Sequence, residues 1–224
     1  MYNLRLAIFD FDGTIYPGET LPFLCKEWLR QKRSRARFVR VMLSLVPMYL
    51  KYKLKAGSKE HMKKSALLGF LRLFQGEDEE HARRFFVDAY REMKNKLDKN
   101  VLVEAQMLKE SGHELVLASG ALLPLLEEVA MDLGFRRVIG TRLPVNRGRI
   151  DPCLDIDYVN SGRKVERLLE EYPADSADFR GSYAYADSFS DLTLLELVGN
   201  PVAVNPEKGL YQVALERGWR IMNR

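Results

Sequence analysis

The sequence predicts an α/β fold: a parallel sheet with helices on both faces, and a small helical cap domain inserted after the first strand. Strand-like apolar runs alternate with segments of helical periodicity, which is the pattern of a parallel sheet covered on both faces. Between residues 19 and 96 the alternation stops and the pattern is almost wholly helical. We therefore expect a core formed by residues 1–16 and 97–224 and a helical cap formed by residues 17–96.

The first strand is expected at residues 4–9, a short apolar run that leads into acidic and glycine residues. Similar runs predict further strands at residues 114–120, 136–142, 183–187 and 201–205. Asn146-Arg147-Gly148 predicts a turn after the strand that ends near residue 142.

Helical periodicity fills the intervals between these strands, at residues 101–110, 122–133, 164–171 and 192–198. Inside the cap, Pro47, Gly57 and Gly76 are expected to end helices. No segment of the cap has a convincing strand pattern.

The composition is that of an ordinary soluble globular protein. Hydrophobic residues make up 46% of the 224 residues and charged residues 29%, which is enough apolar material for a substantial core. Cys25 and Cys153 have no metal-ligand spacing, so neither a zinc site nor a disulfide framework is expected. A reducing, cytoplasmic location follows from this, and the N-terminal residues show no signal-peptide pattern.

The positive charge is concentrated in one segment. Between Lys26 and Lys64 there are 13 Lys or Arg and two acidic residues, a local charge of +11, whereas the net charge of the whole chain is +4. The rest therefore carries 4 − 11 = −7. A nucleic-acid-binding protein more often spreads basic residues and aromatics over a whole face, so no nucleic-acid partner is expected. The segment has either a partner of its own or a solvated face.

The run Ile8-Phe-Asp10-Phe-Asp12-Gly-Thr14 places two acidic residues where the first predicted strand ends. Ligands of open α/β sheets bind beyond the carboxyl ends of the strands. One carboxylate there can attack phosphorus, and the other can protonate the leaving oxygen and then activate water. Because two carboxylates repel a phosphate, a divalent cation is needed beside them. The alternative is a capped, solvated turn.

Chemically suitable residues also follow the later strands. Ser119 and Gly120 offer a hydroxyl and a backbone amide to phosphate oxygens, although an ordinary helix cap is the simpler interpretation of that pair alone. Asp187 and Asp191 offer acids to a metal ion. Lys164 opens a helix and, taken alone, is better explained as a solvated lysine.

Together, the motifs DFDGT, LVLASG, GRKVERLL and YADSFSD resemble those of the haloacid dehalogenase superfamily of phosphohydrolases, which have a Rossmann-like core. The helical cap, the segment VIGTRL and the ending NPVAVNPEKGLYQVALERGW are similar to the phosphoserine-phosphatase-like branch, subfamily IB. One departure is Ala186, which stands before Asp187 where the family often has glycine. Both acids of that motif are retained.

The resemblance implies a role for each motif residue. Asp10 is the implied nucleophile, which forms an aspartyl-phosphate, and Asp12 the general acid and base. Mg²⁺ is the implied cofactor, with Asp10, the backbone carbonyl of Asp12, and Asp187 as its ligands. Thr14, Ser119, Gly120 and Lys164 are the implied phosphate-binding residues, and Asp191 supports Lys164 or metal-bound water.

The resemblance also suggests how the substrate is chosen. Phosphoserine phosphatases have a substrate-reading glutamate at the place of Glu19, which is equally suited to the first turn of a helix. For the cap cation that such enzymes use, Lys63, Lys64 and Arg72 lie in the right region, but none aligns convincingly.

Residues 38–54 combine apolar and basic residues, as interfacial helices do, and the uninterrupted apolar run is too short to span a bilayer. Weak contact of the basic cap with an anionic membrane is one expectation. Burial of the apolar side within the cap is the other.

We therefore expect a Mg²⁺-dependent phosphomonoester hydrolase that acts on a small phosphorylated metabolite, such as a phosphoserine-like compound, or on a lipid head-group phosphate. Two alternatives remain open: a phosphotransferase or phosphomutase with the same site, and a non-enzymatic binding module with a basic surface. The sequence names neither the physiological substrate nor the oligomeric state.

Overall fold

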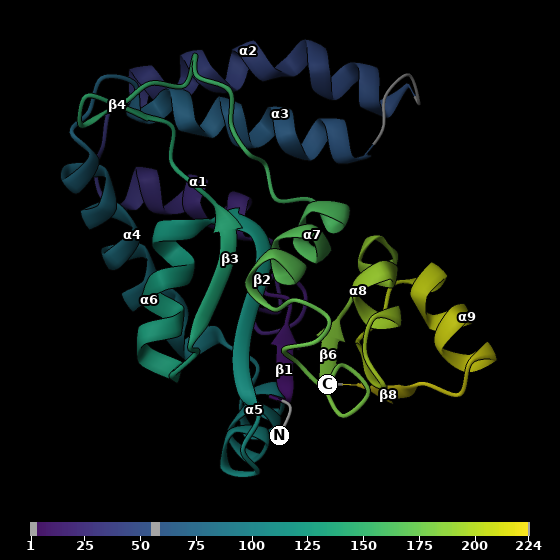
Figure 1. Ribbon diagram of the computed structural model, residues 1–224. Helices are drawn as coiled ribbons and strands as arrows, with labels where there is room; N and C mark the ends of the chain where they lie inside the picture. Colours follow the sequence, from purple (N-terminus) through teal and green to yellow (C-terminus); the bar gives the residue numbers. More distant parts are fainter. Residues whose placement is uncertain (1–3, 55–58, 224) are drawn as a thin grey trace.

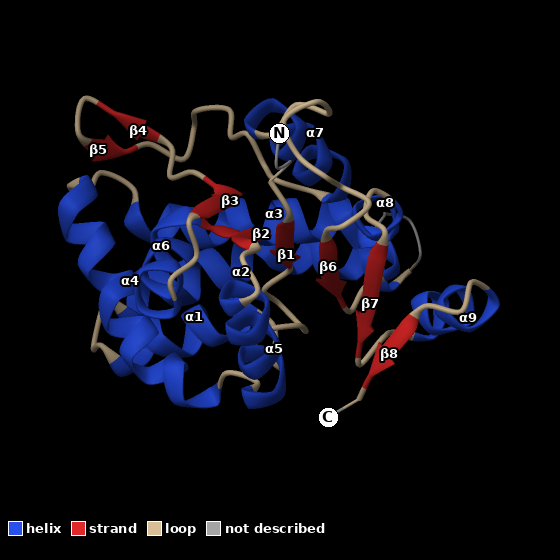
Figure 2. Cartoon of the chain, turned by 60° about the horizontal axis from the view of Figure 1, so that its bottom comes forward, coloured by secondary structure: helices blue, strands red, loops and turns tan. Residues whose placement is uncertain are grey.

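The computed structural model describes residues 4–54 and 59–223, and its centre is a parallel sheet. The order of the strands in this part of the chain is β3-β2-β1-β6-β7-β8 (Figure 2). Their bounds are Leu6–Phe9 for β1, Glu114–Leu122 for β2, Arg137–Thr141 for β3, Tyr183–Ala186 for β6, Asn200–Val204 for β7 and Arg220–Met222 for β8.

β1 is the point where the order of the strands changes direction. Its Ile8 lies in register with Val116 of β2 on one side and with Ala184 of β6 on the other. The chain continues outward from β2 to β3 on the first side, and from β6 to β7 and β8 on the second. In open α/β sheets this arrangement leaves a crevice beyond the carboxyl ends of the central strands.

Both faces of the sheet are covered by helices (Figure 1). Side chains of a strand alternate between faces, so Ala7 and Phe9 pack in one hydrophobic cluster and Leu6 and Ile8 in the other. The first cluster contains residues of α5 (Lys99–Glu110) and α6 (Leu123–Leu133), and the second those of α7 (Ser161–Glu171), α8 (Leu192–Glu196) and α9 (Lys208–Glu216). The predicted α/β fold is confirmed.

Residues 19–96, hereafter the insert, contain no strand within their described part, and their regular elements are helices joined by turns. Its elements are α1 (Thr20–Arg30), α2 (Arg35–Lys53), α3 (Lys59–Leu71), η1 (Arg72–Phe74), α4 (Glu79–Met93) and η2 (Lys94–Lys96). Trp28, Phe74 and Phe85 form an aromatic cluster at its centre. Since these rings belong to the same hydrophobic cluster as Phe9, the insert packs continuously with the sheet. The division at residues 17–96 stays a prediction.

The prediction that Pro47 ends a helix is wrong, because α2 continues through it. Proline removes one backbone hydrogen bond and costs about 3 kcal/mol inside a helix. Pro47 lies on the exposed side of α2, whereas Val41 and Leu45 hold the helix against the rest of the insert. Packing therefore outweighs the local preference. Gly76 does follow a helix, at φ +78°, and Gly57 lies outside the described residues.

The predicted strands and core helices all exist, with ends that differ by a few residues. β8 was not predicted. The expected turn at Arg147 and Gly148 joins a two-stranded hairpin, β4 (Val145–Asn146) and β5 (Arg149–Ile150). The hairpin is attached to the insert, because Gly148 O accepts from Glu79 N at 2.9 Å and Ile150 exchanges backbone hydrogen bonds with Gly76 and Glu77.

Among residues 4–54 and 59–223, no helix is both long enough and apolar enough to cross a bilayer. The cytoplasmic location stays a prediction.

Candidate active site

The candidate site lies where the central strands end. The backbone N–H of Asp10, the residue after β1, still donates to Tyr185 O of β6 at 2.9 Å, so this residue is held at the edge of the sheet. Asp187 follows β6, and Ser119 lies in the last part of β2. Because the strands are parallel, the structure brings these residues of three motifs to one edge.

Lys164 joins two of the motifs through its ammonium group. Its Nζ donates to Asp10 Oδ1 at 2.8 Å and to Asp191 Oδ1 at 2.7 Å. The three side chains are at most 6% exposed. Lys164 lies in the second turn of α7, whose first turn is capped by Asn160 Oδ1 accepting from Arg163 N. The interpretation of Lys164 as a solvated surface residue is therefore excluded.

The buried ion pairs keep Lys164 charged. Burial alone lowers the pKa of an ammonium group, but the charges of Asp10 and Asp191 outweigh it and raise the pKa of Lys164 above its ordinary value. Burial raises the pKa of Asp10 to about 6, against the opposing effect of Lys164. Asp10 is accordingly ionised, and able to act as a nucleophile, at neutral pH.

A cluster of three carboxylates fits a cation. Asp10, Asp187 and Asp191 each offer an oxygen, and these oxygens lie within 4.8 Å of one another. Burial, followed by the charges of Asp10 and Asp191, raises the pKa of Asp187 to about 7. Such crowding of negative charge is relieved when a divalent cation binds, and carboxylate oxygens are the ligands that Mg²⁺ prefers. Residues of the predicted metal site are thus brought together, with Asp191 beside Asp10 and Asp187.

Asp12 faces the insert. Its Oδ1 accepts from Thr20 N at 2.9 Å and from the Thr20 hydroxyl, so the carboxylate caps the start of α1. Burial raises the pKa of Asp12 to about 7, and the Thr20 hydrogen bond opposes that shift. A carboxyl that titrates near neutral pH suits a general acid and base. Metal binding by its backbone carbonyl stays a prediction.

Gly13 allows Asp187 to approach the loop. It has φ +76°, a conformation that favours glycine, and a Cβ at this position would lie 2.0 Å from Asp187 Oδ2. The glycine of the DFDGT run therefore makes room for a carboxylate of the cluster.

The predicted phosphate-binding residues lie around the same edge. Ser119 and Thr14 are buried, and Ser119 Oγ accepts from Ala121 N at 3.2 Å. Thr141, which was not predicted, donates its hydroxyl to Gly120 O at 2.9 Å and accepts from Val159 N at 3.2 Å. It thereby ties the loop before α7 to the end of β2. The segment VIGTRL, which contains Thr141, was noted for its resemblance to the phosphoserine-phosphatase-like branch, but no role was assigned to Thr141.

The insert contributes a charged pair. Lys63 of α3 lies 3.5 Å from Glu19, with side chains 39% and 58% exposed, respectively. Burial alone lowers the pKa of Lys63, but the charges of the nearby acidic groups outweigh burial and raise the pKa above its ordinary value. These groups are Glu19, Asp12, Tyr158 and Asp10, so the ammonium group faces the site. Of the three candidate cations in the insert, the structure brings Lys63 to Glu19.

Tyr158 completes this side of the site. A Cβ on Gly120 would lie 3.6 Å from the Tyr158 hydroxyl, so the tyrosine lies beside the predicted phosphate-binding backbone. Burial raises the pKa of its hydroxyl, and Lys63 opposes the shift. The sequence marked no role for this residue, because it lies in an irregular loop without a motif.

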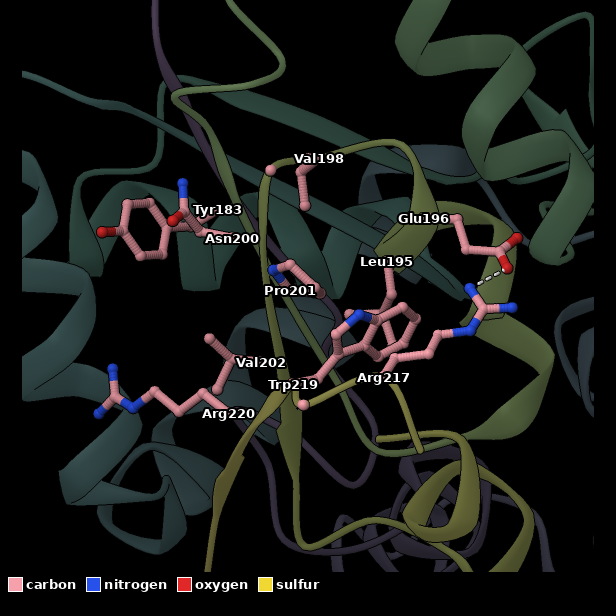
Figure 3. Close-up of a pocket in the computed structure, with 12 residues that line it drawn as sticks. Tyr183, Leu195, Glu196, Val198, Asn200, Pro201, Val202, Arg217, Trp219 and Arg220 are labelled. Carbon is pink, nitrogen blue, oxygen red and sulfur yellow. Dashed lines mark hydrogen bonds and ion pairs between the residues drawn. The ribbon is translucent and has the colours of Figure 1, made fainter. Parts of the chain in front are cut away.

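A separate cavity of about 870 Å³ lies at the β7–β8 edge (Figure 3). Its two arginines already have acidic partners: Arg217 pairs with Glu196, and Arg220 forms two hydrogen bonds with Glu104. None of the predicted catalytic residues lines it. The chemistry is therefore concentrated at the ends of β1, β2 and β6.

The four motifs that converge here agree with a comparison against known protein families. The model of haloacid dehalogenase-like hydrolases matches residues 7–196. This chain belongs to the haloacid dehalogenase-like hydrolase family. Membership, together with relatives named as phosphatases, confirms the prediction of a phosphatase-type enzyme.

Relatives with curated names include three of interest. The chain is 28% identical to the "Inhibition of morphological differentiation protein" of Streptomyces azureus, over 97% of this chain and 77% of that one. It is 31% identical to a histidinol-phosphatase of Neisseria meningitidis over 55% of this chain and 56% of that one. It is 28% identical to phosphoserine phosphatase SerB1 of Mycobacterium tuberculosis, over 52% of this chain and 38% of that one. The chain thus spans about half or less of the two named phosphatases.

Solved structures share the fold. A Bordetella pertussis Tohama I protein of unknown function superposes with a TM-score of 0.81 at 23% identity, covering 98% of both chains. A substrate-bound phosphoserine phosphatase gives a TM-score of 0.66 at 15% identity, covering 99% of this chain and 94% of that one.

Proposed function

We propose that this enzyme is a Mg²⁺-dependent phosphomonoester hydrolase that acts through an aspartyl-phosphate on Asp10. The observation that carries the proposal is the buried contact of Lys164 with Asp10 and Asp191 beside Asp187. Three carboxylates and one ammonium group leave a formal charge of −2, which attracts a cation before a phosphate can enter.

In the first step, an oxygen of Asp10 attacks phosphorus and the bond to the leaving oxygen breaks. The leaving alkoxide takes its proton from Asp12, whose pKa of about 7 allows it to hold a proton at neutral pH. Lys164, already 2.8 Å from Asp10, lies where it offsets the negative charge of the transferring phosphoryl group.

In the second step, Asp12 removes a proton from water, and the oxygen of that water attacks phosphorus. The bond between phosphorus and Asp10 breaks, so inorganic phosphate leaves and the Asp10 carboxylate is restored. Ser119 and the backbone around Gly120 hold the phosphoryl oxygens in both steps.

Asp10, Asp187 and the backbone carbonyl of Asp12 would hold Mg²⁺, with Asp191 beside them. The bound ion supplies positive charge that polarises the phosphoryl group and offsets the repulsion between the phosphate and the carboxylates.

The substrate is a small phosphate ester whose leaving group lies between the insert and the core. Glu19 and Lys63 offer opposite charges on the insert side, and Tyr158 offers a hydroxyl on the core side. Two relatives, the phosphoserine phosphatase and the histidinol-phosphatase, are named for small phosphate esters that contain an amine. We therefore place an amine-containing phosphomonoester first among candidate substrates.

The test is phosphate release from p-nitrophenyl phosphate by the purified chain, with Mg²⁺ and after treatment with EDTA. Turnover should require Mg²⁺, and Asp10→Asn should abolish it while leaving the circular dichroism spectrum unchanged. A panel of phosphorylated metabolites, with phosphoserine, histidinol phosphate and lysophospholipids included, then ranks substrates by kcat/KM.

Two outcomes would replace the proposal. If turnover required an added acceptor alcohol, the enzyme would be a phosphotransferase. If neither the panel nor p-nitrophenyl phosphate were hydrolysed with Mg²⁺ present, a non-enzymatic binding function would be favoured instead.

A further inference from the structure

The outer face of α2 is apolar and exposed. Val39, Leu43, Val46 and Leu50 are 54%, 66%, 45% and 53% exposed, and their spacing of four, three and four residues places them on one side of the helix. Figure 1 shows α2 as the outermost helix of the insert, with α3 beneath it. Isolated exposed apolar residues are common, but a row of four along one helix indicates an interaction surface.

The apolar face is broad rather than a narrow seam. At 100° per residue, Tyr49 and Pro47 extend the same face on either side, and it covers an arc of about 160°. Val41 and Leu45, on the opposite side, pack within the insert. A helix that pairs with one partner helix needs only two apolar positions per seven residues. The breadth of this face fits a flat apolar medium better.

The charges around the face favour an anionic surface. Residues 35–53 contain no Asp or Glu. Exposed Arg35 and Lys53 lie at the two ends of the helix and Arg40 on its flank. The Lys53 ammonium nitrogen lies 5.8 Å from the centre of the Tyr49 ring, which places a cation beside an aromatic at the margin of the apolar face. An apolar face with basic margins is the arrangement of helices that lie in the interface of anionic bilayers.

We propose that α2 docks the enzyme on anionic membrane surfaces, with Val39, Leu43, Val46 and Leu50 entering the interface. A symmetric contact between two copies is less favourable, because it brings two acid-free, basic helices together. Lys63 faces the catalytic site from α3. Leu45 of α2 packs against Gly69 of α3, so the apolar face on the opposite side of α2 points away from α3. Docking therefore places the enzyme at a membrane without making the lipid its substrate.

The test is co-sedimentation of the whole chain with vesicles of phosphatidylserine and phosphatidylcholine, compared with vesicles of phosphatidylcholine alone. The double variant Leu43→Gln/Leu50→Gln removes the centre of the face. Leu215→Gln is the matched control, because Leu215 is a leucine 54% exposed on the remote helix α9. Arg35→Gln/Arg40→Gln tests the charges.

The parent should bind anionic vesicles at 0.1 M salt and be released at 1 M, where the screening length falls from about 10 Å to about 3 Å. Each double variant should weaken binding about tenfold or more, whereas Leu215→Gln should bind like the parent. Turnover of p-nitrophenyl phosphate should be unchanged in all variants, which separates docking from catalysis.

Three results would overturn the proposal: no binding of the parent to anionic vesicles at low salt, equal binding of the parent and Leu43→Gln/Leu50→Gln, or equal binding to both kinds of vesicle. Sedimentation equilibrium tests whether a second copy of the chain occupies the apolar face of α2 instead. A parent dimer that Leu43→Gln/Leu50→Gln converts to a monomer would assign the face to a second copy instead.

Discussion

The ammonium nitrogen of Lys164 lies 2.8 Å from Oδ1 of Asp10, and both side chains are 6% exposed. These residues are 154 positions apart in the sequence, and their contact joins the N-terminal part of α7 to the residue that follows β1. The same nitrogen contacts Asp191 at 2.7 Å, so one buried cation faces two carboxylates. Removing one partner of such a group leaves buried charge uncompensated, which is costly.

Lys164→Met should therefore affect both catalysis and stability. We expect kcat/KM for p-nitrophenyl phosphate to fall by about 10²–10³ or more, the loss that follows removal of one group that stabilises transition-state charge. The free energy of unfolding should fall by about 3–5 kcal/mol, as measured by urea denaturation. Lys64→Met, the same change on α3, should alter both by little. Parental turnover in Lys164→Met would remove Lys164 from the proposed mechanism.

Gly13→Ala should disrupt the carboxylate cluster through a steric clash. The new Cβ would lie 2.0 Å from Asp187 Oδ2, so either the loop or Asp187 must move. We expect a loss of turnover of at least about tenfold and a higher Mg²⁺ concentration for half-maximal activity, since a misplacement of about 1 Å can cost 10²-fold.

Gly148→Ala is the matched control for this substitution. Gly148 has the same φ of +76°, and a Cβ added there would have no neighbouring atom within 4 Å. It therefore carries the backbone strain without the clash. If Gly148→Ala and Gly13→Ala reduced turnover equally, the effect would be one of backbone strain and not of Asp187 placement.

Much of the candidate site was predictable, because several of its side chains lie at or directly after the ends of parallel strands. Asp10, Ser119 and Asp187 were predicted from acidic or hydroxyl residues after apolar runs, and parallel strands bring such residues to one edge. Tyr158 was not predicted, because it lies in an irregular loop that leaves no periodic pattern. Thr141 lies at the end of a predicted strand, but its hydrogen bonds with Gly120 and Val159 depend on how separate segments pack, which the strand pattern does not show. Pro47 misled the prediction of α2, since a local preference was outweighed by packing that single residues do not reveal.

Stability without metal should decrease as pH rises. Burial raises the pKa of Asp10 to about 6 and that of Asp187 to about 7, so both carboxyls bind protons more tightly in the folded chain than in the unfolded one. Their contribution to stability is present below about pH 4 and is lost as pH rises through about 7. We expect the free energy of unfolding, measured with urea in EDTA, to decrease over that range.

Asp187→Asn tests the cause of this decrease. The variant should be more stable than the parent at pH 7.5 in EDTA, on the order of 2 kcal/mol, and should differ little at pH 4. Mg²⁺ should stabilise the parent at pH 7.5 and the variant much less. Asp155→Asn, at an exposed carboxylate, should reproduce neither effect. A parent whose stability in EDTA rises with pH over this range would contradict the prediction.

The pair of Glu19 and Lys63 should determine the choice of substrate and leave the chemistry of the phosphate largely unchanged. The leaving group of p-nitrophenyl phosphate has no amine or carboxylate for this pair, so Lys63→Gln and Glu19→Gln should change its kcat by less than about threefold. For the best charged substrate of the metabolite panel, loss of a hydrogen bond to a charged group should lower kcat/KM by about 10–100-fold, mainly through KM. Glu19→Gln should act most on substrates with an amine, and Lys63→Gln on those with a carboxylate.

Lys64→Gln, one residue further along α3, is the control for a general loss of positive charge. If Lys64→Gln weakened the charged substrate as much as Lys63→Gln did, the effect would be long-range attraction of an anion, and the assignment of a specific contact to Lys63 would be wrong.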